Sequence, residues 1–219
     1  MNLKNIKYLF FLLMTAFVLS SCSETDDDAS QSEYANWQER NNKAFGDTLA
    51  YAKAQIAAGS TDWKIFLNWS LEGQTPNKDP NGNNVNLSYD DDDYIVVHVL
   101  HAGNGEETPM YTDSIQMSYR GRLIPTDSYK DGYVFDQTFQ GSYNAATALP
   151  AKKTVDYGWI DGYTTALLKM HVGDHWQVFI PENLGYGSEE RTGIPKYSML
   201  RYELVLNAYK RGKGAWIAE

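Results

Sequence analysis

Aromatic and turn-forming residues gather in the last third of this chain, together with one carboxylate. They occur in four separate segments: 134–136 (VFD), 158–159 (GW), 184–187 (LGYG) and 193–195 (GIP). An aromatic side chain taken alone is more often buried for packing than placed for function. Asp136 changes that balance, because a carboxylate among apolar neighbours needs hydrogen-bond partners to stay there. We therefore predict that these segments converge on one apolar pocket with a carboxylate.

Metal chemistry is the other possibility that the residue types raise. His98 and His101 are three residues apart, and His171 and His175 are four apart. Zinc sites combine such pairs with cysteine or carboxylate ligands at recognisable spacing, and that spacing is missing here. The run 90–93 (DDDD) likewise lacks the spaced ligands and the glycine of a calcium loop. We predict a solvated loop there, no metal site and no cofactor.

A helical segment is expected well before the pocket residues, between Glu33 and Ala58. Its apolar residues recur at intervals of three, four or their sums. They are Tyr34, Trp37, Phe45, Leu49, Ala52 and Ile56. Gly46 costs a helix about 1 kcal/mol relative to alanine, so a kink or two shorter helices are alternatives to one helix. The apolar stripe predicts packing on its own domain; a homodimer contact or a partner-binding arm is the alternative.

Strands are predicted in most of the remaining chain, from alternation of apolar and polar residues over 114–124, 175–180 and 200–206 and from aromatic and branched residues over 63–71. The expected strands are 63–71, 94–100, 114–124, 133–136, 175–180 and 200–206. Asn, Pro, Gly and Asp are abundant over 74–93, which predicts a loop. The only helical period in this half is short and covers 161–170. Together these elements predict an α+β domain over 94–210 with an N-terminal extension over 33–93 and a tail over 211–219.

The N-terminal residues predict export and a lipid anchor. A basic start is followed by an apolar run over 8–19, which is too short to span a bilayer comfortably. The run ends at Leu19-Ser20-Ser21-Cys22, which resembles the bacterial lipobox, in which the cysteine is acylated. We therefore expect a lipoprotein signal peptide over 1–21, a lipidated Cys22, an acidic tether over 22–32, and a place in the cell envelope. The outer membrane, facing the periplasm or the cell surface, is the expected location.

Composition excludes one class of partner. The net charge is −9, 42% of the residues are hydrophobic and 21% are charged. Nucleic-acid binding depends on clustered lysine and arginine, and the sequence contains no such run. We therefore expect no nucleic-acid partner. The overall composition is that of an ordinary globular protein.

Eight short motifs, in order and near a familiar spacing, resemble those of the FKBP-type peptidyl-prolyl cis-trans isomerases over roughly 105–209. They are 117–121 (MSYRG), 134–136 (VFD), 158–159 (GW), 170–174 (MHVGD), 180–181 (IP), 184–187 (LGYG), 194–195 (IP) and 200–204 (LRYEL). The resemblance implies a twisted antiparallel half-barrel wrapped around one short helix.

The resemblance also implies which residues form the pocket and which molecules bind there. Its lining would be Tyr119, Phe135, Asp136, Val155, Trp159, Tyr186, Ile194 and Tyr202. Trp159 would form the floor at the helix N-terminus. Tyr186 and the backbone amide of Asp156 would donate hydrogen bonds to a proline-containing polypeptide, and Asp136 would be the pocket carboxylate. We interpret Asp136 as orienting its neighbours, without a general-base role.

Isomerisation of an Xaa-Pro bond suits such a pocket because it makes no bond to the substrate. Twisting the amide breaks its resonance, a barrier of about 18–20 kcal/mol, and shifts charge back onto nitrogen. A water-poor aromatic cavity disfavours the polar planar amide more than the twisted one. A thousandfold acceleration needs only about 4 kcal/mol of differential stabilisation.

Some residues depart from the family pattern and leave alternatives open. Asp156 stands where the family usually carries an apolar residue, the loop around Gly193 is one residue shorter than its commonest form, and Tyr202 replaces the usual phenylalanine. Asp136, Tyr186 and Trp159 together favour an isomerase. The altered loop and Asp156 favour a non-catalytic proline-peptide-binding module or chaperone. An adhesin-like protein that uses the fold only as a scaffold is a third possibility.

Overall fold

The computed structural model describes residues 33–218. The predicted signal peptide, Cys22 and the acidic tether all lie outside the described residues. The compact unit to which the fold and the site belong begins at Asn36. Within the described part of the chain, no helix combines the length and the apolar character that a membrane span requires.

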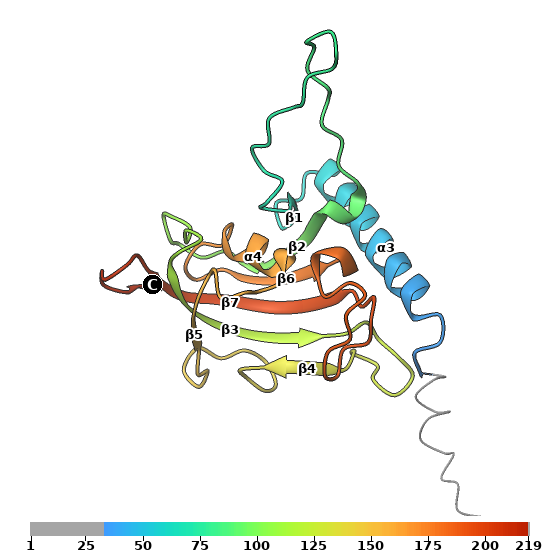
Figure 1. Cartoon of the computed structure of the whole chain (residues 1–219). Helices are drawn as coiled ribbons and strands as arrows, with labels where there is room; N and C mark the ends of the chain where they lie inside the picture. Colours follow the sequence, from blue (N-terminus) through green and yellow to red (C-terminus); the bar gives the residue numbers. More distant parts are fainter. Residues whose placement is uncertain (1–32, 219) are drawn as a thin grey trace, which may run out of the picture. The chain divides into compact units, whose positions relative to one another are not determined.

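An antiparallel sheet of eight strands forms the framework of this unit (Figure 1). The strand order is β1-β2-β6-β7-β3-β4, while β5 pairs with β3 and β8 pairs with β7. The strands are β1 (Trp63–Leu67), β2 (Tyr94–His101), β3 (Ser114–Arg122), β4 (Val134–Gln137), β5 (Ala151–Thr154), β6 (His175–Ile180), β7 (Leu200–Lys210) and β8 (Ile217–Ala218). The strands predicted here are confirmed as β2, β3, β6 and β7. Burial alternates at the start of β3, β6 and β7, whereas Ile95, Val96 and Val97 of β2 are buried in succession.

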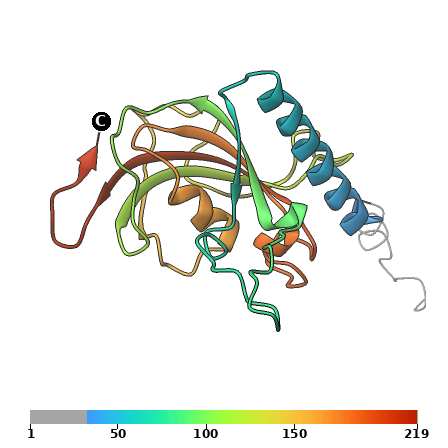
Figure 2. The ribbon, with the colours of Figure 1, turned by 90° about the horizontal axis from the view of Figure 1, so that it is seen from above.

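Two α-helices pack on opposite faces of this sheet. Helix α4 (Asp161–Leu167) lies against one face, which we call the inner face (Figure 2). There the ring of Tyr163 from the helix contacts the rings of Tyr119 and Tyr202 from the sheet. Helix α3 (Trp37–Ala57) lies against β1, β2 and β6 and meets Trp63 on the outer face. The short 3₁₀ helices η1 (Asp91–Asp93) and η2 (Glu182–Leu184) complete the elements. The α+β half-barrel around one short helix is thus confirmed.

Helix α3 is one continuous element, so the kink and the two-helix alternatives at Gly46 were wrong. Gly46 is exposed, and a side chain at this position would contact no other atom. The glycine therefore destabilises the helix only through its greater conformational entropy in the unfolded chain. Ile56 was expected in the apolar stripe but is 41% exposed, because the last turn of the helix extends past the sheet. The stripe packs on its own domain, as the sequence favoured, through Trp37, Phe45 and Leu49.

Other element boundaries also differ from the prediction. The strand expected over 63–71 ends at Leu67, because the chain then turns onto α4, where the Trp69 amide donates to Thr165 Oγ1 (3.1 Å). The helix expected over 161–170 ends at Leu167. The amides of Lys169 and Met170 both donate to the Ala166 carbonyl, which forms a turn before β6. Strand β5 was not predicted, since Ala-Lys-Lys-Thr has no apolar alternation. It exists because it pairs with the edge of β3.

Polar contacts fasten the start of α3 to the segment just before β7. The indole N–H of Trp37 donates to Ser198 Oγ (2.8 Å), and the Met199 amide donates to Asn41 Oδ1 (2.8 Å). Asn41 is 1% exposed, and its amide group also donates to the Trp37 carbonyl (2.6 Å). Buried polar groups of this kind are retained when each finds a partner. The N-terminal extension is therefore an integral part of the compact unit.

A charged network on the outer face predicts acid sensitivity. Glu203 accepts a hydrogen bond from Arg120 Nη2 (2.6 Å), and its other oxygen lies 2.9 Å from His175 Nε2. Burial of Glu203 favours its neutral form, but the hydrogen bonds with His175 and Arg120 outweigh burial and lower its pKa. A depressed folded-state pKa contributes stability that is present above the unfolded value and is lost as the pH falls through the folded one.

We therefore expect the stability of the protein to fall below about pH 4.5 and Glu203→Gln to remove part of that dependence. Urea midpoints measured at about pH 6 and about pH 3.5 for both proteins check this expectation. Glu190→Gln, an exposed change of the same charge, serves as the control. An identical pH dependence in the parent and in Glu203→Gln would contradict the assignment.

Candidate active site

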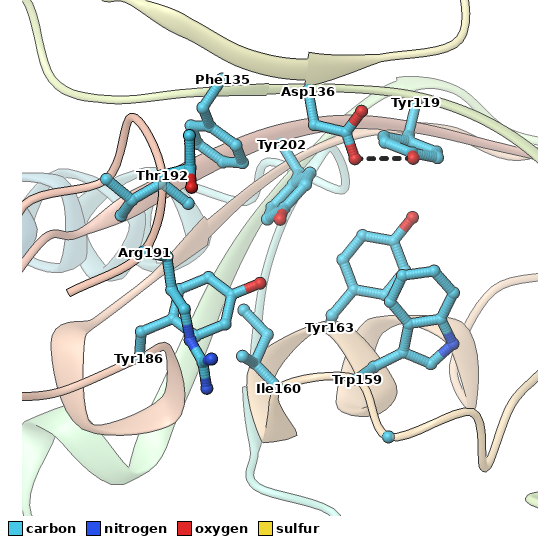
Figure 3. Close-up of a pocket in the computed structure, with 12 residues that line it drawn as sticks. Tyr119, Phe135, Asp136, Trp159, Ile160, Tyr163, Tyr186, Arg191, Thr192 and Tyr202 are labelled. Carbon is cyan, nitrogen blue, oxygen red and sulfur yellow. Dashed lines mark hydrogen bonds between the residues drawn. The ribbon is translucent and has the colours of Figure 1, made fainter. Parts of the chain in front are cut away.

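A cavity of about 450 Å³ lies between the inner face of the sheet and α4 (Figure 3). Strands β3, β4 and β7 supply one wall, and the segment that enters α4 supplies another. The third wall comes from the chain between η2 and β7. The lining residues are Tyr119, Phe135, Asp136, Gly158, Trp159, Ile160, Tyr163, Tyr186, Arg191, Thr192, Ile194 and Tyr202. All six residues expected to carry the chemistry and the expected Ile194 are thus brought together.

Tyr202 is the centre of the aromatic wall (Figure 3). Its ring meets Phe135 edge-to-face at 5.5 Å between centroids and Tyr163 at 4.9 Å. Such edge-to-face pairs contribute about 0.5–1.5 kcal/mol each beyond area burial. Gly121 makes this approach possible, because a Cβ there would lie 2.4 Å from the Phe135 ring and 2.8 Å from the Tyr202 ring. The glycine of the 117–121 motif therefore shapes the cavity directly.

Trp159 and Tyr163 form the wall on the helix side. Their rings stack at 4.9 Å, and the Trp159 indole N–H donates to the Thr154 carbonyl (3.1 Å). Trp159 is half-buried, whereas Tyr163 is 1% exposed and directs its hydroxyl to Met117 Sδ (3.1 Å). Tyr163 was read only as part of the helical stripe. Trp159 precedes the helix, which begins at Asp161, so helical spacing could not have paired the two rings; the folded entry to α4 stacks them.

Asp136 lies at the exposed edge of the cavity and accepts a hydrogen bond from the Tyr119 hydroxyl (2.7 Å). The sequence argument pictured a carboxylate enclosed by apolar neighbours. Strand β4 is at the edge of the sheet, which leaves Asp136 partly open to water. Its charge is therefore balanced by one phenol and by solvent, and it faces the entrance of the cavity.

The tyrosine hydroxyls of the cavity stay protonated at neutral pH. Burial raises the pKa values of Tyr163 and Tyr202 well above their usual value. Burial, followed by the hydrogen bond to Asp136, also raises the pKa of Tyr119. Burial raises the pKa of Tyr186 as well, although nearby Arg191 opposes the shift. All four phenols can therefore donate hydrogen bonds throughout the physiological range.

Arg191 and Thr192 belong to the lining but were not expected there. The Arg191 guanidinium lies 5.3 Å from the centre of the Tyr186 ring and forms an ion pair with Glu189. A cation over an aromatic face holds both groups in place. The sequence showed only that this loop is unusually charged, because the fold decides which of its side chains turn toward the cavity.

Val155 and Asp156 do not line the cavity, which corrects the assignment taken from the resemblance. Val155 is fully buried and its amide donates to the Asp113 carbonyl (3.0 Å), so it belongs to the core. Asp156 is exposed, and the lining begins two residues later at Gly158. The turn over 155–158, in which Gly158 adopts a φ of 88°, separates the two residues from the cavity wall.

An antiparallel half-barrel with an aromatic cavity against a short helix defines the FKBP class of domain. The family model of the FKBP-type peptidyl-prolyl cis-trans isomerases matches residues 105–207. Residues 105–207 are thus identified as an FKBP-type domain, and that family is one of isomerase enzymes.

Similar proteins agree with that assignment. The macrophage infectivity potentiator of Trypanosoma cruzi is 33% identical over 126 residues, which are 57% of this chain and 58% of the relative. The FKBP-type 22 kDa peptidyl-prolyl cis-trans isomerase of Escherichia coli is 36% identical over 113 residues, which are 51% of this chain and 48% of the relative. The alignments span about half the length of these relatives.

A solved peptidyl-prolyl cis-trans isomerase from Pseudomonas syringae is similar in fold. Its TM-score is 0.50 at 25% sequence identity, and the match covers 80% of this chain and 96% of the solved one. The similarity therefore extends beyond the residues that the family model matches.

Proposed function

We propose that this protein is a peptidyl-prolyl cis-trans isomerase that assists the folding of exported proteins. The observation that carries the proposal is the convergence of Tyr202, Phe135 and Trp159 on one cavity, with Asp136 and the Tyr186 hydroxyl at its edge. A prolyl ring is apolar and compact, and a cavity of about 450 Å³ has room for it and its neighbours. The activity and its polypeptide substrates follow from this arrangement and from membership of the family.

Desolvation is the main source of rate in this proposal. The planar Xaa-Pro amide is strongly polar and loses its hydration when the aromatic rings surround it. The twisted amide has a less polar carbonyl and therefore loses less hydration energy in the cavity. The free-energy barrier to rotation falls as a result. No nucleophile, base or metal is required for this rotation.

Hydrogen-bond donors fix the substrate while the amide turns. The Tyr186 hydroxyl remains a donor because burial raises its pKa, and we assign it to the carbonyl before the proline. The main-chain amide of Asp156, a residue that does not line the cavity, is assigned to the substrate segment that runs past the entrance. Asp136 holds the Tyr119 hydroxyl and sets the local field.

Removing the Tyr186 hydroxyl tests the first of these donors. Tyr186→Phe should lower kcat/KM about 3- to 12-fold, because one neutral hydrogen bond contributes about 0.5–1.5 kcal/mol. The measurement is the isomerisation rate of a short Xaa-Pro peptide. Tyr197→Phe, in the same loop but outside the lining, is the matched control. Equal rates for the parent and Tyr186→Phe would remove Tyr186 from the donor role.

The isomerisation rate of the unmodified protein separates the two main functions. An isomerase accelerates the reaction of the peptide, whereas a non-catalytic proline-peptide-binding module or chaperone leaves the rate at its uncatalysed value. Peptide binding, measured in parallel by isothermal titration calorimetry, shows whether the cavity is occupied. Binding without acceleration would end the catalytic proposal and support the binding module.

We further propose that Cys22 carries a lipid that anchors the protein in the cell envelope, at the outer membrane. The support is the apolar run over 8–19 and the Leu19-Ser20-Ser21-Cys22 segment. Labelling cells with a radioactive fatty acid should mark the parent but not Cys22→Ala. An unlabelled parent protein would exclude the anchor.

A homodimer through α3 would have to use the exposed side of this helix. The apolar side already packs on β1, β2 and β6 of the same chain. Sedimentation equilibrium decides whether a dimer forms.

A further inference from the structure

Three arginines line a small cavity of about 260 Å³ on the outer face of the sheet, together with Asp131, Gln177, Tyr202 and Glu203. Arg120 and Arg122 come from β3 and Arg201 comes from the neighbouring strand β7. Along each strand they alternate with the residues that turn to the inner face, such as Tyr119 and Tyr202. This arginine cavity therefore lies on the opposite side of the sheet from the aromatic cavity, on the part of the outer face next to the strands that α3 covers.

Arg122 and Arg201 stand directly opposite each other in the β3–β7 ladder. Like charges in this position destabilise a sheet, and both side chains are half-buried, where water screens them less. Burial, followed by the charge of Arg122, lowers the pKa of Arg201, and the charge of Asp131 opposes the shift only in part. A pair of opposed arginines with this repulsion is favoured where a bound anion compensates the two positive charges.

The hydrogen bonds of this pair are weak. Arg122 Nη1 reaches the carbonyls of Asp131 and Gly132 at 3.4 Å, and Arg201 Nη1 reaches the Asp131 carbonyl at 3.4 Å. Across residues 33–218, no carboxylate oxygen lies within 4.0 Å of either guanidinium. Arg120 is different, since it bonds Glu203 and the Gly141 carbonyl, each at 2.6 Å.

We propose that Arg122 and Arg201 form a binding site for a phosphate group, present either as a free ion or as a phosphomonoester. Each guanidinium is a planar fork with several N–H donors, and two forks on adjacent strands can share one tetrahedral oxyanion. Bound there, the anion removes the repulsion between the two arginines and replaces their long contacts to carbonyl groups. The site is independent of the proposed isomerase activity.

The sequence conceals this site because the charge is spread along the chain. The net charge is −9, and Arg122 and Arg201 lie far apart in the sequence. Only the antiparallel register of β3 and β7 places them together. The cavity is small, so it fits a single phosphate group and gives no track for a nucleic acid.

Thermal unfolding of the full-length protein tests the proposal. Inorganic phosphate and, in a second series, glycerol 3-phosphate are titrated against chloride at matched ionic strength. A ligand that binds only the folded state raises Tm, and at ten times Kd the rise should be about 3–6 °C. The double variant Arg122→Gln/Arg201→Gln should lose this saturable rise. Lys213→Gln, an exposed change of the same charge, should keep it.

Each protein is compared with its own Tm in chloride, so a changed baseline stability does not affect the result. A rise with inorganic phosphate supports a site for the free ion, and a larger rise with glycerol 3-phosphate supports an esterified phosphate. No saturable rise in the parent protein, or an equal rise in the double variant, would overturn the proposal.

Discussion

Replacing Asp136 with alanine will lower kcat/KM for an Xaa-Pro peptide by about 10- to 100-fold, because a hydrogen bond to a charged group contributes about 1.5–3 kcal/mol. Asp136 accepts the Tyr119 hydroxyl at 2.7 Å, so its removal frees that phenol and changes the field at the entrance. The chemistry requires no proton transfer. The loss should therefore be nearly the same at about pH 6 and about pH 8, since a general base would give a pH-dependent loss.

Two further variants define what Asp136 contributes. Asp136→Asn keeps an acceptor for Tyr119 but not the charge, so we expect it to recover part of the rate. Asp127→Ala removes a fully exposed carboxylate elsewhere and should leave the rate unchanged. An unaltered rate in Asp136→Ala would show that desolvation by the aromatic rings is sufficient alone.

Replacing Trp37 with alanine will destabilise the protein by about 3–5 kcal/mol, the usual cost of removing a large buried aromatic residue. Trp37 is 6% exposed and donates to Ser198 Oγ, so the variant loses both packing and a partner for a buried hydroxyl. For a domain of this size the change corresponds to a fall in Tm of roughly 6–20 °C. Calorimetry of the two proteins measures it.

Trp216→Ala is the matched control for this experiment. Trp216 is 36% exposed, and the Lys210 ammonium group lies over its ring. Loss of this exposed side chain should change Tm little. Equal Tm values for the parent and Trp37→Ala would mean that α3 is not held on the sheet. The contacts of Asn41 with Met199 would then have to be reassigned as well.

Much of the fold follows from local pattern. The alternation at the start of β3, β6 and β7 arises because each of these strands turns one side toward the core, and that period is visible in the sequence. Helix α3 shows its buried stripe in the same way. The aromatic residues of the site were recognisable because their types and order resemble a family. These features depend on residues that are close together or on motifs that keep their spacing.

What the sequence did not reveal depends on contacts between distant segments. Asn41 stands in the buried stripe midway between Trp37 and Phe45, but it is polar, and its burial depends on the Met199 amide that donates to it from the other end of the chain. Strand β5 exists only through its pairing with β3. Val155 appeared in the expected lining, but the turn that ends at Gly158 directs it into the core. Side-chain direction after a turn is a property of the folded backbone.

The attachment of α3 to the segment before β7 has a consequence for the order of assembly. The hydrogen bonds from Trp37 to Ser198 and from Met199 to Asn41 join positions 161 and 158 residues apart. Contacts of such long range form slowly, because a large loop must close first. During synthesis α3 would leave the ribosome early, but its hydrogen bonds to Ser198 and Met199 could form only after almost the whole polypeptide had been synthesised. The segment that bears Tyr186 and Ile194 should therefore be among the last parts to become ordered.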